Sequence, residues 1–170
     1  ITDGDIIVEN AGLALNEALI DVLRKTGLCI TEVDQGIRCQ AGDALQAVDV
    51  STEPFPGFPT DMQAQLMALL CVAKGKSIIK EQIFENRFMH AHELCRMGAK
   101  IDVSDQIAVV HGGTLSGADV KMTDLRAGAA MVLAGLVADG HTEIYGLDHL
   151  KRGYYKLLEK LTSLGAEIIL

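Results

Sequence analysis

The sequence predicts an α/β domain with internal pseudo-threefold symmetry, with buried helices inside and with sheets and amphipathic helices outside. Two observations predict this fold class. A unit that opens on a glycine, continues through a strand and an amphipathic helix, and closes on another glycine occurs three times. Two further helices, between these units, are almost free of charge. Units of this kind stack so that each buries the surface that it cannot bury alone.

The three glycine-bounded units have nearly the same length and span Gly4–Gly27, Gly75–Gly98 and Gly140–Gly165. In each, a short apolar run after the first glycine is typical of a strand. The helix of the first unit has apolar residues at helical spacing, namely Leu15, Leu19, Val22 and Leu23. The closing glycine suits the left-handed position that ends a helix, and we expect another strand to follow it.

The two nearly uncharged helices are expected at Asp61–Ala73 and Asp124–Ala138, and each opens with a Thr-Asp pair suited to the N-cap. A helix that is apolar nearly all round is buried. We therefore interpret residues 1–170 as a single domain with a partial first repeat at 1–50, a second repeat at 58–111 and a third at 120–170. The first copy lacks a leading buried helix, which suggests that the chain begins within a repeat.

Composition restricts the possible partners. A chain of 170 residues that is 49% hydrophobic can bury the core of one domain. Its net charge of −8 argues against nucleic acid, which needs a clustered basic face, but a few local arginines can still bind a small anion. The longest apolar run, Leu66–Ala73, is too short to cross a membrane. The first residues lack a basic and an apolar region, so we expect no signal peptide.

Cysteine and histidine residues give no metal-binding pattern, and we expect no metal site. The four cysteines show no CxxC pair and no histidine at metal spacing, which is typical of free thiols in a reducing cytosol: Cys29, Cys39, Cys71 and Cys95. Of these, Cys71 lies in an apolar helical stripe and is expected in the core. His90 and His92 are two residues apart, which places them on different faces of a helix.

Three arginines are candidates for binding an anion. Arg87 and Arg152 follow their leading glycines at the same distance, and Arg126 lies in the first turn of a buried helix. Guanidinium groups bind phosphate and carboxylate with two parallel hydrogen bonds, and a helix N-terminus adds N–H donors. Each arginine could instead pair with a nearby acid, for example Arg87 with Glu85 or Arg152 with Asp148. Their equivalent places in a symmetric fold favour the anion site.

Asp61 starts a helix with little other charge. It could be an N-cap, as we expect of Asp124 at the same place in the next repeat, or a general base at the edge of the domain. The residue pattern alone leaves both interpretations open.

Several short motifs together resemble the UDP-N-acetylglucosamine 1-carboxyvinyltransferase family: Phe58-Pro-Thr-Asp-Met-Gln-Ala-Gln65, Phe84-Glu-Asn-Arg-Phe-Met-His90, Leu94-Cys-Arg-Met-Gly-Ala99, Leu115-Ser-Gly-Ala118, Thr123-Asp-Leu-Arg-Ala127 and Arg152-Gly-Tyr154. The resemblance runs through the whole chain and is strongest over residues 57–165. The paired Pro-Thr-Asp-Met-Gln-Ala-Gln and Glu-Asn-Arg-Phe motifs are its most specific part.

The resemblance implies an inside-out α/β domain of repeated βαβαββ units with buried helices, one of two such domains with a substrate cleft between them. It implies transfer of the enolpyruvyl group of phosphoenolpyruvate to the 3′-hydroxyl of UDP-N-acetylglucosamine, with release of phosphate and without a metal or organic cofactor. This is the first committed step of peptidoglycan synthesis in the bacterial cytoplasm, so a role in cell wall biogenesis, cell shape and cell division is expected.

The resemblance also assigns site residues. Asp61 matches the base that takes the proton of the sugar hydroxyl, and Arg126 and Arg152 match the arginines that hold the phosphate and carboxylate of phosphoenolpyruvate. The other substrate-binding positions are a contact to the nucleotide sugar, an arginine at the cleft, and an acid that orients Arg126 or assists proton transfer: Ile83, Arg87 and Asp124.

Some parts of the family pattern are not found in this sequence. The Lys-Asn pair and the flexible loop with the general acid belong to segments outside it, and none of the four cysteines has the loop motif. We therefore expect a C-terminal half that needs the N-terminal domain and is inactive alone. Two other interpretations are a 3-phosphoshikimate 1-carboxyvinyltransferase relative and a non-catalytic binding or scaffold domain.

Overall fold

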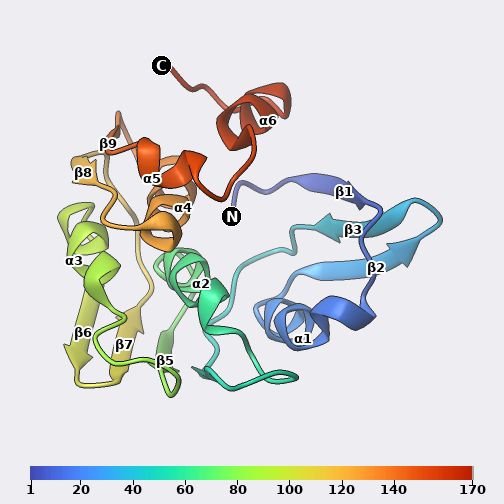
Figure 1. Ribbon diagram of the computed structural model, residues 1–170, viewed down its shortest axis with the longest axis horizontal. Coiled ribbons are helices and arrows are strands. Elements are labelled where there is room, and N and C mark those ends of the chain that lie inside the picture. The colour runs from blue at the N-terminus through green and yellow to red at the C-terminus, as the bar shows by residue number, and fades with distance from the viewer. Residues whose placement is uncertain (170) are drawn as a thin grey trace.

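Two buried helices, α2 (Gln63–Leu70) and α4 (Leu125–Gly135), pack against each other at the centre of the computed structural model, which describes residues 1–169 (Figure 1). Every residue of α2 is buried. A 3₁₀ turn, η2 (Thr60–Met62), precedes α2, so the regular helix begins later than its Thr-Asp pair suggests. The prediction of two buried helices is confirmed, and these helices divide the rest of the chain into three units.

The first unit contains β1 (Asp5–Glu9), the 3₁₀ turn η1 (Ala14–Asn16), α1 (Glu17–Lys25), β2 (Cys29–Val33) and β3 (Gly36–Gln40). Its strands form an antiparallel sheet in the order β1-β3-β2. A small core of its own joins Ile20 of α1 to Ile30 and Ile37 of the sheet. Leu15, predicted to belong to the apolar spacing of this helix, instead lies in η1 before the α-helix begins, and it is 84% exposed.

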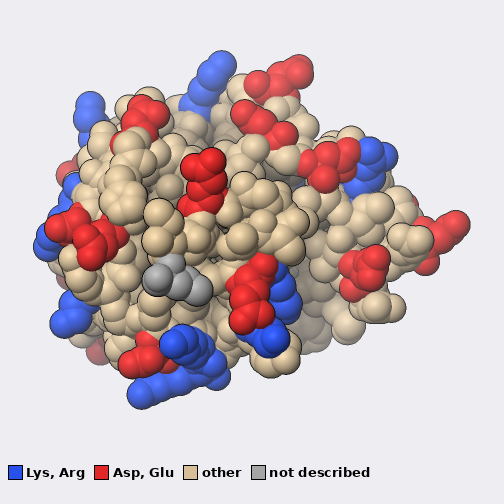
Figure 2. Space-filling view, turned by 90° about the horizontal axis from the view of Figure 1, so that it is seen from above, with Lys and Arg blue, Asp and Glu red and all other residues tan. Residues whose placement is uncertain are grey.

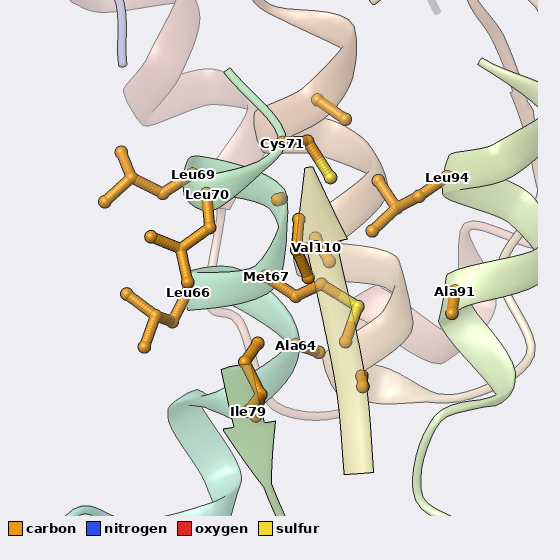
Figure 3. Close-up of a cluster of buried hydrophobic side chains, with 14 of the residues drawn as sticks. Ala64, Leu66, Met67, Leu69, Leu70, Cys71, Ile79, Ala91, Leu94 and Val110 are labelled. Carbon is orange, nitrogen blue, oxygen red and sulfur yellow. The ribbon is translucent and has the colours of Figure 1, made fainter. Parts of the chain in front are cut away.

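The second unit contains β4 (Val50–Ser51), β5 (Lys76–Lys80), α3 (Met89–Arg96), β6 (Lys100–Ser104) and β7 (Ile107–His111). The sheet order is β4-β5-β7-β6, with β4 parallel to β5 and the other pairs antiparallel. Side chains from α2, α3 and this sheet converge in the main core, as Met67, Leu94, Val110 and Ile79 show in Figure 3. In this packing β5 contacts α2, and α3 contacts α4 and β6.

The third unit contains β8 (Asp119–Lys121), β9 (Glu143–Tyr145), α5 (Asp148–Lys151) and α6 (Leu157–Ser163). Strands β8 and β9 form a parallel pair. The strand expected after Gly165 is not formed: residues 166–169 pair with no strand among the described residues, so their backbone groups lack the partners that a strand requires. The closing glycines of the three units all have positive φ, as predicted: +97° at Gly27, +89° at Gly98 and +100° at Gly165.

The surface carries charged side chains of both signs. On the face seen in Figure 2, Lys and Arg side chains are interspersed with Asp and Glu and form no continuous basic patch. Within residues 1–169, every helix is too short or too polar to span a lipid bilayer. The four cysteines are free, and Cys71 is buried as predicted.

Candidate active site

The carboxylate of Asp61 lies between two arginines that come from other parts of the chain. Its Oδ1 accepts a hydrogen bond from Nε of Arg126 at 2.6 Å and one from Nη2 of Arg87 at 3.3 Å. Asp61 lies inside η2, and the N-cap position of α2, Met62, has no side-chain cap. The side chain of Asp61 is 63% exposed. The N-cap interpretation of Asp61 is therefore wrong, and its carboxylate faces the arginines and solvent.

Asp124, by contrast, is the N-cap of α4, as predicted. Its Oδ1 accepts the backbone N–H groups of Arg126 at 2.9 Å and of Ala127 at 3.1 Å. Burial raises the pKa of Asp124, but the hydrogen bonds from Ala127 and Arg126 outweigh it, so the pKa lies below its usual value. The cap fixes the first turn of α4 and thereby directs Arg126 toward Asp61.

Arg87 precedes α3 and is held on two sides. Its guanidinium lies over the ring of Phe84, 4.5 Å from the ring centroid, which is a cation–π contact. Its other contact is the ion pair with Asp61. The alternative pairing of Arg87 with Glu85 is not formed in the described part of the chain. The Asp61 site thus combines side chains from the starts of two buried helices and from the loop before α3.

Glu81, which the sequence analysis missed, connects the two loops of this site. Its side chain is 1% exposed, and its carboxylate accepts the hydroxyl groups of Thr52 and Thr60, each at 2.8 Å. It also accepts the backbone N–H groups of Ile83 at 3.0 Å and Phe84 at 3.2 Å. Glu81 therefore holds the residue before Asp61 and the ring beneath Arg87 in one hydrogen-bonded unit. An acid directly after a strand that contains Ile78 and Ile79 is the one sequence signal that could have identified it.

A cavity of about 60 Å³ lies beneath the arginines, and among the side chains that line it are Thr60, Gln63, Arg87, His90, Asp124 and Arg126. His90 is 3% exposed, and burial lowers its pKa to about 4, so the imidazole is neutral near pH 7. His92 is exposed, which confirms that the two histidines lie on different faces of α3. Within residues 1–169, no group of three histidine, cysteine or acidic side chains could ligate a metal ion.

Two predicted site residues lie outside this cluster. Ile83 is partly buried and is fixed through its backbone by Glu81. Arg152 follows α5 and is exposed, and within residues 1–169 it makes no ion pair, since Asp148 pairs with Lys151 instead. The neighbouring Gly153 lies against Leu125, where a Cβ atom would be 2.7 Å from Leu125 Cδ2. Arg152 therefore borders the start of α4 without touching Asp61.

The geometry provides an acid and a pair of cations that a ligand can separate. An ion pair that is open to solvent contributes only about 0–1 kcal/mol, so an anionic ligand can take the guanidinium groups from Asp61 at little cost. Asp61 would then be left as a carboxylate beside a bound anion, positioned to accept a proton. The arginines would offset negative charge that develops on the ligand.

Comparison with known proteins agrees with this fold. Residues 1–161 match the family model described as EPSP synthase (3-phosphoshikimate 1-carboxyvinyltransferase). The chain therefore belongs to the EPSP synthase family of carboxyvinyltransferases. The predicted fold class is confirmed by this match and by the solved enolpyruvyl transferase described next.

Individual relatives are more specific. The chain is 52% identical over 169 residues to UDP-N-acetylglucosamine 1-carboxyvinyltransferase 1 of Caldanaerobacter subterraneus subsp. tengcongensis, a match that covers 99% of this chain and 41% of that protein. It is 51% identical to the UDP-N-acetylglucosamine 1-carboxyvinyltransferase of Myxococcus xanthus, with 99% and 40% covered. The enolpyruvyl transferase NikO of Streptomyces tendae superimposes with a TM-score of 0.80 at 33% identity, with 91% of this chain and 36% of that chain covered. The resemblance inferred from the motifs is confirmed, and the chain spans about two fifths of the length of these relatives.

Proposed function

We propose that this chain supplies the base and the anion-binding arginines of an enzyme that transfers the enolpyruvyl group of phosphoenolpyruvate to the 3′-hydroxyl of UDP-N-acetylglucosamine. The observation that carries the proposal is the Asp61 carboxylate, which lies between Arg126 at 2.6 Å and Arg87 at 3.3 Å. The names of the relatives at about half identity support the two substrates.

The chemistry is an addition followed by an elimination. Asp61 accepts the proton of the 3′-hydroxyl group while the oxygen of that hydroxyl group bonds to the enol carbon of phosphoenolpyruvate. An acid outside this chain protonates the methylene carbon. Loss of that proton and of phosphate then restores the double bond. Arg126 and Arg152 bind the phosphate and carboxylate groups, and Arg87 stands beside them at the cleft. Preorganised cations of this kind stabilise charge as it moves from the enol to the leaving phosphate.

The remaining parts of the proposal concern the whole enzyme. Asp124 orients Arg126 through the helix cap, and Ile83 contacts the nucleotide sugar. The part of the relatives' length that this chain does not span supplies the acid and the other side of the cleft, so the 170-residue chain alone is inactive. The complete enzyme acts in peptidoglycan synthesis in the bacterial cytoplasm, and through it in cell shape and division.

The test is enolpyruvyl transfer by a chimera in which residues 1–169 replace the matching stretch of the Caldanaerobacter subterraneus relative. Phosphate release from phosphoenolpyruvate is measured with UDP-N-acetylglucosamine in one arm and with shikimate 3-phosphate in the other. We expect turnover in the first arm and none from the chain alone. The description of the matching family favours shikimate 3-phosphate as a second candidate acceptor, and turnover in that arm only would replace our proposal with it.

A further inference from the structure

Two buried polar side chains on the wall of the cavity have hydrogen-bonding atoms without a partner among residues 1–169. Gln63 of α2 is 1% exposed, and neither Nε2 nor Oε1 of its amide makes a hydrogen bond. His90 of α3 is 3% exposed, and its Nε2 has no hydrogen-bond partner among the same residues. Buried polar atoms nearly always have a hydrogen-bond partner, since leaving one unpaired costs its full desolvation energy. Two such side chains on one cavity wall indicate a site for a polar occupant, which is a water molecule or a ligand group.

The charges around the cavity select an anion. The guanidinium groups of Arg87 and Arg126 both belong to its lining. Asp124 also lines it, but Asp124 Oδ1 already accepts two backbone N–H groups at the start of α4. The carboxylate of Asp61 engages both arginines and is not among the lining residues. The balance at the cavity is therefore positive, and it becomes more so when a ligand displaces Asp61.

The two unpartnered side chains can both act as neutral donors. Burial lowers the pKa of His90 to about 4; Asp124 opposes that shift and Arg87 reinforces it. The neutral imidazole has one N–H group, which it can present at Nε2. The amide of Gln63 donates from Nε2. A volume of about 60 Å³ admits a group of a few oxygen atoms and excludes a sugar ring.

We propose that Gln63 and His90 form the floor of an oxyanion subsite, where they donate hydrogen bonds to a carboxylate or phosphoryl oxygen whose charge Arg87 and Arg126 balance. The inference rests on the proposed function, whose substrates carry both kinds of oxyanion, and it adds two binding residues to that site. The two neutral donors restrict the position of an oxyanion that the arginines alone would hold more loosely.

The experiment is a titration of the 170-residue chain, followed through the ring NMR signals of its histidines. Pyruvate is the carboxylate probe, and inorganic phosphate is the phosphoryl probe. We expect the signal of His90, identified by its loss in His90→Gln, to shift and saturate, while His92 on the exposed face of α3 does not respond. Gln63→Leu should weaken binding about tenfold or more, because it removes a hydrogen bond to a charged group.

A matched control lies two residues along the same helix. Gln65 is also buried and its Oε1 lacks a partner among residues 1–169, but its Nε2 donates to the hydroxyl of Tyr154 at 2.9 Å and it does not line the cavity, so Gln65→Leu should bind as the wild type does. If Gln63→Leu fails to fold, Gln63→Met, which keeps the length of the side chain, serves in its place. Saturation by pyruvate or by phosphate supports the subsite and identifies the group that it takes.

The proposal is overturned if the His90 signal responds to neither probe, a result that needs no variant. It is also overturned if folded Gln63 and Gln65 variants bind equally well. Turnover is not measured in this experiment, so its failure leaves the transferase proposal untouched. Conversely, a chimera without turnover would not alter an oxyanion titration at His90.

Discussion

A Thr-Asp pair precedes each of the two buried helices, and its side chains make different contacts in the two places. At α4, the carboxylate of Asp124 caps its own helix, and the hydroxyl of Thr123 donates to that same carboxylate at 3.4 Å. At α2, the hydroxyl of Thr60 donates to Glu81, and Asp61 pairs with Arg126 and Arg87. The carboxylate of Asp124 therefore bonds within its own helix start, whereas Thr60 and Asp61 contact other segments of the chain.

This difference explains why only one of the two acids is free to meet the arginines. An acid that caps a helix already accepts the N–H groups of that helix, which occupies its lone pairs and lowers its pKa. Asp61 has no such partners because it lies inside η2, which has no side-chain cap, and the neighbouring hydroxyl of Thr60 donates to Glu81. The start of α4 contributes the capped turn that carries Arg126, while η2 contributes the free carboxylate that Arg126 meets.

The largest effect should follow removal of the free carboxylate. In the chimera, Asp61→Asn should lower the turnover number about 10²–10⁴-fold, the loss that is typical of a missing general base. The free energy of unfolding should change little, since the side chain is exposed. Steady-state phosphate release and urea unfolding of the same preparation measure both quantities.

The matched control is Asp102→Asn, which removes another exposed acid with a basic partner, here His111 at 3.6 Å, from the edge strand β6. It should keep wild-type turnover. If Asp61→Asn also turned over at the wild-type rate, Asp61 would be no base, and the comparison between the two helix starts would describe packing alone.

The second effect concerns Glu81, whose carboxylate accepts the hydroxyl group of Thr60. Glu81→Ala leaves two backbone N–H groups and two hydroxyl groups without a buried acceptor, so we expect the chain to lose about 3 kcal/mol of unfolding free energy. Glu81→Gln can still accept at its carbonyl and donate to the oxygen of Thr60, and should cost about 1 kcal/mol. Urea denaturation of the chain measures both, and equal losses in the two variants would contradict this account of Glu81.

The third effect is a pH dependence that comes from His90. This residue lines the same cavity as Asp124, the cap of α4, and its pKa is lowered. Because the folded-state pKa of about 4 is below the ordinary 6.5, the unfolded chain binds the proton more readily between these values. The contribution of neutral His90 to stability is therefore present above pH 6.5 and is lost as the pH falls toward 4. Between about pH 7 and pH 5 the loss should be about 2 kcal/mol.

The measurement is urea unfolding of the wild type and of His90→Gln at both pH values. The variant should lack this part of the pH dependence, whereas His92→Gln, changed on the exposed face of the same helix, should keep it. A wild type and a His90→Gln variant with the same slope against pH would show that His90 ionises normally in the folded chain.

The features that the sequence predicted correctly are those that depend on neighbouring residues. The apolar composition of α2 and α4 and the closing glycines are local patterns, and the structure has both. Short motifs identified Asp61, Arg87 and Arg126 as candidate site residues, and the fold brings the three side chains into contact.

The features that were missed depend on segments far apart in the chain. Glu81 looks like the polar end of a strand, and only the loop of Thr52 and Thr60 makes it a buried acceptor. Gln63 belongs to the Phe58–Gln65 motif, but the sequence alone predicts no role for it. A glutamine in an otherwise apolar helix is a signal for a buried polar site, but the cavity that gives it meaning needs α3 and α4 as walls.

The smallest predicted effect compares the two acids directly in stability. Asp124→Ala removes a helix cap and should cost about 1 kcal/mol of unfolding free energy, whereas Asp61→Ala, which removes only exposed ion pairs, should cost less than about 0.5 kcal/mol. The pKa of Asp124 is lowered in the fold, so its contribution is present above the ordinary value of 3.8 and is lost as the pH falls through the folded-state pKa. Urea unfolding should therefore show a gap between the variants near pH 7 that narrows in acid, and a larger loss from Asp61→Ala would reverse the roles assigned to the two helix starts.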